Sequence, residues 1–137
     1  MNRRSFLAVS AGTLALLPFK ASAAATQYTE GLVRTELAAG KTVFLDFTAS
    51  WCSTCASQKR TIAALKAENP AYEQNVTFID VDWDTYGNGK LSKSLNIPRR
   101  STLVVLKGDA ELGRIVAGTR KADIKALMDV ALKAATA

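Results

Sequence analysis

No histidine occurs among the 137 residues, and cysteine occurs only twice, at Cys52 and Cys55. Without histidine the chain cannot complete the mixed cysteine and histidine ligand set of a zinc site, and two thiolates alone are an incomplete set. Lysine and arginine form a few adjacent pairs but no dense basic run. The sequence therefore predicts neither a bound metal ion nor a nucleic-acid partner, since nucleic-acid phosphates require concentrated positive charge.

The sequence has one long apolar run, over residues 6–19. This run is shorter than the roughly 20 residues that a membrane-spanning helix needs. Arg3 and Arg4 precede it, and residues 21–23 form a cleavage site of small side chains. We therefore predict that residues 1–23 are an export signal peptide of the twin-arginine type, which leads to the bacterial periplasm. An ordinary Sec signal and an uncleaved anchor are the alternatives.

The remaining residues, 24–137, suffice for one domain with a single core. Helices are predicted where apolar residues or helix formers recur at helical spacing, over 29–39, 53–69, 90–95 and 120–134. Strands are predicted where short apolar segments are rich in strand formers, over 43–48, 76–81, 102–106 and 111–116. Helical crossovers require parallel pairing of the first strands, whereas the short last turn makes an antiparallel pair. The predicted fold is α/β, a three-layer α/β/α sandwich with a mixed, mostly four-stranded sheet.

The two cysteines lie in the pentapeptide Trp51-Cys52-Ser53-Thr54-Cys55, directly after a predicted strand and at the start of a predicted helix. At a helix N-terminus, unpaired backbone N–H groups and the helix dipole stabilise a thiolate. In thiol-disulfide exchange a thiolate attacks a disulfide, and a second thiol then resolves the mixed disulfide. We therefore predict a redox-active disulfide, in which Cys52 is the attacking thiol and Cys55, one turn further into the helix, is the resolving thiol.

The chain resembles the thioredoxin-fold family of thiol-disulfide oxidoreductases in its segment from Asp46 to Cys55, at residues 96–97 and in the strand 102–106. The resemblance implies an enzyme that acts on protein thiols or disulfides as a monomer, without an organic cofactor. It also implies that Asp46 is buried behind the disulfide and exchanges a proton with Cys55 through water. Burial would raise the pKa of this carboxyl toward the range that such an exchange needs. Alternatively, Asp46 satisfies backbone donors near the sheet end.

One loop departs from the family pattern. Family members carry a cis-proline directly before the strand that begins here at Thr102-Leu103, and matching that dipeptide to the family pattern puts Ser101 at the proline position. Since a cis bond before a non-proline residue costs about 3 kcal/mol, a trans bond between Arg100 and Ser101 is favoured. A shifted loop in which Pro98 takes over the role is the alternative. By resemblance, the substrate-binding residues are Trp51, Arg100, Ser101 and Thr102.

Two other functions remain open at this point. A serine in place of proline would leave room for a metal ion beside the sulfurs, so the domain could carry copper or zinc, and soft thiolates favour Cu(I). The chain could also be a non-catalytic binding module whose cysteines form a structural disulfide in an oxidising compartment. Such a disulfide would close only a four-residue loop and would constrain the unfolded chain little.

The direction of electron flow is predicted from the same resemblance. Residues 44–55, together with residues 80–83, are similar to periplasmic thiol reductases. A reductase outside the cytoplasm needs a membrane donor of electrons, whereas an oxidase needs a quinone-linked membrane acceptor. We therefore predict an exported reductase with a membrane electron donor as its partner.

Overall fold

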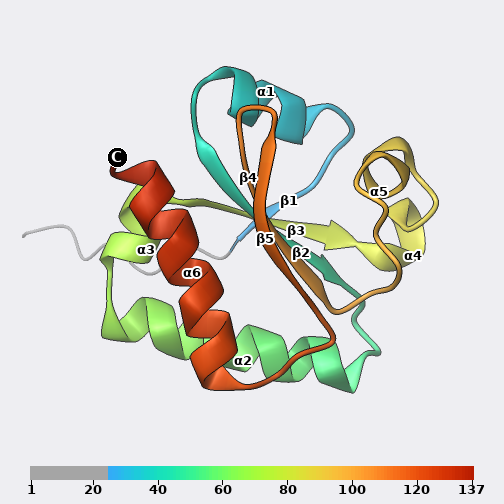
Figure 1. The fold of residues 1–137 in the computed structure, drawn as a ribbon. Coiled ribbons are helices and arrows are strands. Elements are labelled where there is room, and N and C mark those ends of the chain that lie inside the picture. The colour runs from blue at the N-terminus through green and yellow to red at the C-terminus, as the bar shows by residue number, and fades with distance from the viewer. Residues whose placement is uncertain (1–24) are drawn as a thin grey trace, which may run out of the picture.

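A five-stranded sheet with the strand order β1-β3-β2-β4-β5 crosses the molecule (Figure 1). The computed structural model describes residues 25–137, so the predicted signal peptide lies outside the described residues. The strands are β1 (Thr26–Gln27), β2 (Thr42–Thr48), β3 (Thr77–Asp82), β4 (Thr102–Lys107) and β5 (Ala110–Val116). The helices are α1 (Leu32–Ala38), α2 (Ser53–Glu68), α3 (Ala71–Asn75), α4 (Trp83–Tyr86), α5 (Lys90–Ser94) and α6 (Lys121–Ala135).

The sheet is mixed, as predicted. The central strand β2 pairs in parallel with β3 and antiparallel with β4, and β4 forms an antiparallel hairpin with β5. All four predicted strands are present. The fifth strand, β1, is a two-residue edge strand that pairs in parallel with β3. Sequence patterning missed it because its two residues are polar and exposed, and only their distant pairing makes them a strand.

The predicted helices are confirmed, with two short ones added. The long helix α2 ends where expected, because Asn69, which precedes Pro70, adopts an extended conformation (φ −140°, ψ 97°). The chain then resumes as α3, for which Pro70 supplies the N-cap position. The other added helix, α4, is a single turn after β3, and the Asp82 side chain accepts a hydrogen bond from Thr85 N–H at its start. No helix among residues 25–137 is long and apolar enough to span a bilayer.

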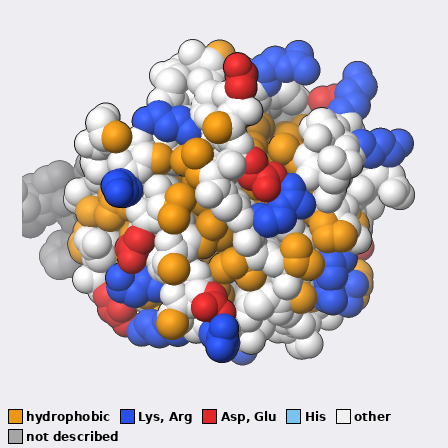
Figure 2. All heavy atoms as spheres, viewed as in Figure 1, with side chains coloured by type: hydrophobic (Ala, Val, Ile, Leu, Met, Phe, Trp, Pro, Cys, Tyr) orange, Lys and Arg blue, Asp and Glu red, His pale blue; other side chains and the backbone are white. Residues whose placement is uncertain are grey.

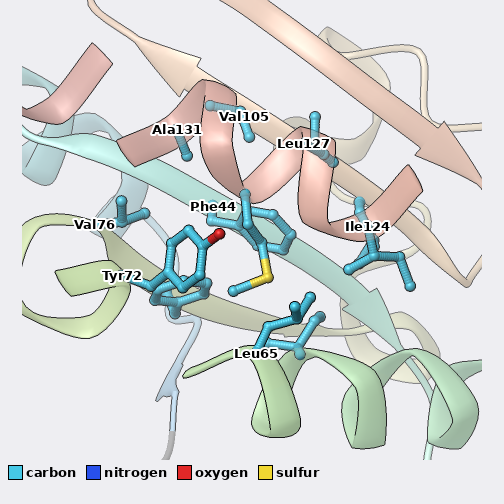
Figure 3. Packing of buried hydrophobic residues seen from close by; sticks show 12 residues of the cluster. Phe44, Leu65, Tyr72, Val76, Val105, Ile124, Leu127 and Ala131 are labelled. Atoms are coloured by element: carbon cyan, nitrogen blue, oxygen red, sulfur yellow. The ribbon is translucent and has the colours of Figure 1, made fainter. Parts of the chain in front are cut away.

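Both faces of the sheet are covered, which explains why β2 and β4 are almost continuously buried. Phe44 of β2 packs on one face with buried residues of α2, α3 and α6, including Leu65, Tyr72 and Ile124 (Figure 3). Neighbouring residues of β2 point to the other face, where Leu45 packs in the cluster that α1, α4 and α5 cover. The three-layer α/β/α arrangement is therefore confirmed.

The sheet topology brings several loops to one edge. Strands β2 and β3 run in parallel and both end there, while the antiparallel strand β4 begins there. The loop from β2 to α2, the segment before β4 and the turn after β5 consequently meet at this edge. On the face viewed in Figure 2, Lys and Arg side chains lie dispersed among acidic and apolar ones.

Candidate active site

Cys52 occupies the N-cap position of α2. Its backbone is extended (φ −91°, ψ 114°), and its sulfur accepts a hydrogen bond from the backbone N–H of Cys55 at 3.2 Å. Cys52 retains 5% of its surface exposure, whereas Cys55 is completely buried. Both are free thiols in this structure. The slightly exposed residue at the helix end and the fully buried residue behind it have the arrangement expected of an attacking and a resolving thiol.

Ser101 lies against both sulfurs. Its hydroxyl oxygen is 3.2 Å from Cys52 Sγ and 3.1 Å from Cys55 Sγ, and the residue is fully buried. None of the peptide bonds among residues 25–137 is cis, so the bond between Arg100 and Ser101 is trans, and Ser101 has φ 63°. The structure therefore places Ser101 opposite the cysteines, as the alignment predicted, whereas Pro98 is exposed.

Hydrogen bonds hold both the N–H group and the carbonyl group of Ser101. Its N–H donates to Phe47 O at 2.7 Å, and its carbonyl accepts from Ala117 N–H and from Gln58 Nε2, both at 2.9 Å. Gln58 Nε2 also donates to Gly118 O at 2.9 Å. One buried side chain of α2 thus ties the loop before β4 to the loop after β5.

Sequence reasoning missed Gln58. A signal for it was present, because Gln58 lies at helical spacing with Cys55, Ile62 and Leu65, the other buried residues of α2. A polar residue on the buried face of a helix needs a hydrogen-bond partner. The identity of those partners, however, depends on how distant loops meet.

The pKa of Cys52 is lowered to about 6. Burial opposes this change, but hydrogen bonds from Cys55 and Ser101 and the side chain of Arg100 favour the thiolate and outweigh it. These groups therefore favour the thiolate form of Cys52. The attacking role predicted for Cys52 thus has an electrostatic basis in the surrounding donors.

Asp46 lies in the middle of β2 and is 3% exposed. Burial raises its pKa to about 7, while the nearby ammonium of Lys59 opposes the rise and the carboxylate of Asp80 adds to it. Its Oδ1 accepts no hydrogen bond from any described residue, so this oxygen does not satisfy backbone donors as the alternative required. A carboxyl with a pKa near 7 is suited to take or give a proton at neutral pH.

The partners of Asp46 come from two other elements. Asp80 lies directly beside it in the parallel register of β2 and β3. Lys59 of α2 reaches both carboxylates, with its Nζ 3.6 Å from Asp46 Oδ2 and 2.6 Å from Asp80 Oδ2. The three side chains line a pocket of about 350 Å³. This pocket is large enough for water to reach the carboxyl.

Trp51 is 60% exposed and lies outside the cysteine pair. Its indole N–H donates to both carboxylate oxygens of Asp84, at 3.0 and 3.1 Å, and the guanidinium of Arg100 stacks 4.4 Å from the centre of its ring. Trp83 instead packs against the buried cluster that contains both cysteines. Thr102 is buried and donates its hydroxyl to Arg99 O at 2.7 Å, so its side chain holds the loop in shape.

No group of three or more histidine, cysteine or acidic side chains that could hold a metal ion occurs within residues 25–137. The only soft donors at the site are the two sulfurs, and the third atom beside them is the hydroxyl oxygen of Ser101. Carriage of copper or zinc therefore stays a prediction from the sequence.

Comparison with known proteins places this geometry in context. The sequence model of the family described as Thioredoxin matches residues 22–130. An H-type thioredoxin of Oryza sativa subsp. indica is 36% identical over 87 residues, which are 64% of this chain and 66% of that protein. An H-type thioredoxin of Brassica campestris is 33% identical over 86 residues, which are 63% and 64% of the two chains. The matches thus span slightly less than two thirds of the length of these relatives.

Solved structures agree with the sequence matches. The Trxlp protein of Edwardsiella tarda gives a TM-score of 0.65 at 25% identity, covering 76% of this chain and 98% of that chain. The thioredoxin of Trypanosoma brucei brucei gives a TM-score of 0.66 at 18% identity, covering 86% of this chain and 99% of that chain, and this second likeness shows the fold alone.

Proposed function

The chain belongs to the thioredoxin family, and from that premise we propose that it is an exported thiol-disulfide oxidoreductase that reduces protein disulfides with the Cys52/Cys55 pair. The observation that carries this proposal is the pairing of Cys52, which caps a helix and has a lowered pKa, with a fully buried Cys55. The substrates are proteins with accessible disulfides. The electrons reside on the two sulfurs, so the reaction requires no bound organic cofactor.

The reaction proceeds in two steps. The Cys52 thiolate attacks the substrate disulfide, a bond forms between Cys52 and one substrate sulfur, and the other substrate sulfur leaves as a thiolate. Cys55 then loses its proton to Asp46 through water and attacks Cys52 Sγ, which releases the second substrate thiolate. Two electrons pass from the cysteine pair to the substrate. The buried carboxyl with its raised pKa supports the role of Asp46 as the base in the second step.

The reductive direction is supported by the resemblance of residues 44–55 and 80–83 to periplasmic thiol reductases. The lowered pKa of Cys52 supports its role as the attacking thiol in either direction. The reduction potential of the cysteine pair decides which direction prevails.

The partners and location follow from the sequence. Residues 1–23 have the pattern of an export signal, so we propose that the protein works in the periplasm as a monomer. There it would receive its electrons from a membrane donor. Replacement of Arg3 and Arg4 by lysine should block export by the twin-arginine route, with the precursor accumulating in the cytoplasm in cell fractionation. Unchanged export of this variant would point to the Sec route.

Insulin reduction tests the exchange reaction. Cys52→Ser should abolish turnover, because no attacking thiolate remains. Cys55→Ser should trap a mixed disulfide with the substrate, visible as a higher-mass species on a non-reducing gel. Ser94→Ala, which changes an exposed residue of α5, should retain activity as the matched control. Equal trapping by both cysteine variants would contradict the assigned roles.

A further inference from the structure

The hydroxyl of Ser101 is in contact with both reacting sulfurs, at 3.2 and 3.1 Å. We propose that Ser101 is a catalytic residue whose hydroxyl donates its hydrogen bond to whichever of the two sulfurs carries negative charge. This inference rests on the proposed exchange reaction of Cys52 and Cys55. It adds a residue that stabilises the thiolate in both steps.

The chemistry of a hydroxyl suits this position. A serine hydroxyl has one hydrogen to donate and two lone pairs that accept. In the reduced pair it can accept from the Cys55 S–H group while it donates to the Cys52 thiolate. The sulfur that is charged changes during the reaction, and rotation of the O–H bond is enough to follow it. A side chain without a donor at this position could not stabilise either thiolate.

The hydroxyl of Ser101 is held in position before the reaction begins. Ser101 has a left-handed backbone conformation (φ 63°), which is uncommon for a residue other than glycine. Hydrogen bonds from its N–H to Phe47 O, and to its carbonyl from Ala117 N–H and Gln58 Nε2, hold that conformation. Since the residue is also fully buried, the hydroxyl has little freedom to turn away from the sulfurs. A donor that is fixed before the charge develops stabilises that charge most effectively.

The reaction balances with the hydroxyl in this role. When Cys52 attacks the substrate disulfide, its negative charge passes to the departing substrate sulfur, and the Ser101 O–H is free to rotate. When Cys55 gives up its proton to Asp46 through water, the O–H donates to the new Cys55 thiolate. Cys55 then attacks Cys52 Sγ and expels the second substrate thiolate. Ser101 neither gains nor loses a proton overall.

Two variants remove the hydroxyl in different ways. Ser101→Ala deletes only the oxygen and keeps the β-carbon. Ser101→Gly deletes the whole side chain but tolerates the left-handed backbone, so it guards against misfolding of the alanine variant. Ser94→Ala removes an exposed hydroxyl of α5 that donates to Leu91 O, and it serves as the matched control. The charged groups that act on Cys52, namely Arg100 and Asp46, are unchanged in all three proteins.

The probe is the small disulfide DTNB, which releases one coloured thiolate when Cys52 attacks and a second when Cys55 resolves the mixed disulfide. Stopped-flow absorbance at 412 nm gives both rates, and absorbance at 240 nm against pH gives the titration midpoint of the Cys52 thiol. We expect both serine variants to raise that midpoint by about one pKa unit and to slow the second release about tenfold at pH 7, since a hydrogen bond to a charged group is lost. Ser94→Ala should match the wild type in both measurements.

The results distinguish a failure of the Ser101 role from a failure of the proposed reduction of protein disulfides. Midpoints and second-release rates that are equal in the wild type, Ser101→Ala and Ser101→Gly would overturn the role of Ser101. Because the probe is not a protein, these measurements do not depend on the natural substrate. A wild type that releases both thiolates from DTNB but reduces no protein disulfide would instead contradict the proposed function.

Discussion

Replacement of the buried carboxyl by an amide should stabilise the protein in a pH-dependent way. Asp46 has its pKa raised from 3.8 to about 7 by burial. Between these two values the folded state keeps a proton that the unfolded state has lost, so stability is greatest below about pH 4 and falls as the pH rises to 7. A difference of about three pKa units, at about 1.4 kcal/mol each, corresponds to a cost of about 4 kcal/mol at pH 8.

In Asp46→Asn the amide side chain cannot ionise, so the variant avoids the free-energy cost of a buried carboxylate. Lys59 keeps its ion pair with Asp80. Urea unfolding of the variant and the wild type at pH 4 and pH 8 measures the effect. The variant should be more stable by about 3 to 4 kcal/mol at pH 8 and by less than about 1 kcal/mol at pH 4. Asp109→Asn, which removes the same charge from an exposed turn, should change stability by less than about 0.5 kcal/mol at either pH. Equal effects of Asp46→Asn at both pH values would mean that Asp46 does not lose its proton at a cost in stability between pH 4 and pH 8.

Two further predictions concern Lys59 and Gln58, two side chains of α2. Lys59→Met removes the cation that lowers the pKa of Asp46. The pH midpoint of the second DTNB release should therefore rise by about one pKa unit. A midpoint that does not move would show that Asp46 is not the base. Gln58→Leu keeps the side-chain volume but removes two hydrogen bonds that hold the loops on either side of the site. It should cost about 2 kcal/mol in urea unfolding and also slow the second release, whereas a loss of stability without any change in rate would show that Gln58 does not position Ser101.

The fold was predictable wherever the pattern was local. The strand 43–48, the start of a helix at the Cys-x-x-Cys motif and the end of that helix before Pro70 all depend on neighbouring residues, and these three structural predictions are confirmed. The edge strand β1 was not predictable, because Thr26 becomes a strand residue only by pairing with Ile79, more than fifty positions away. The single-turn helix α4 is likewise too short to produce a periodic signal.

The candidate site, too, was predictable only where it depends on neighbouring residues in the sequence. The placement of Cys52 at a helix N-terminus follows from the position of the motif between a predicted strand and a predicted helix. The grouping of Asp46 with Lys59 and Asp80 was not foreseen, because it requires the parallel register of β2 and β3 and the orientation of α2 above them. Alignment put Ser101 opposite the cysteines, but its contact with both sulfurs depends on a left-handed backbone that no local pattern indicates.

The equilibrium reduction potential of the Cys52/Cys55 pair tests the proposed reductase function most directly. Indole fluorescence can follow the equilibrium in defined thiol-disulfide buffers, since Trp83 packs against the cysteines. We expect a potential near the value of about −270 mV for thioredoxin, at which the reduced protein gives electrons to most protein disulfides. A potential near about −120 mV, the value of the oxidant DsbA, would contradict it and would mean that the protein donates its disulfide instead.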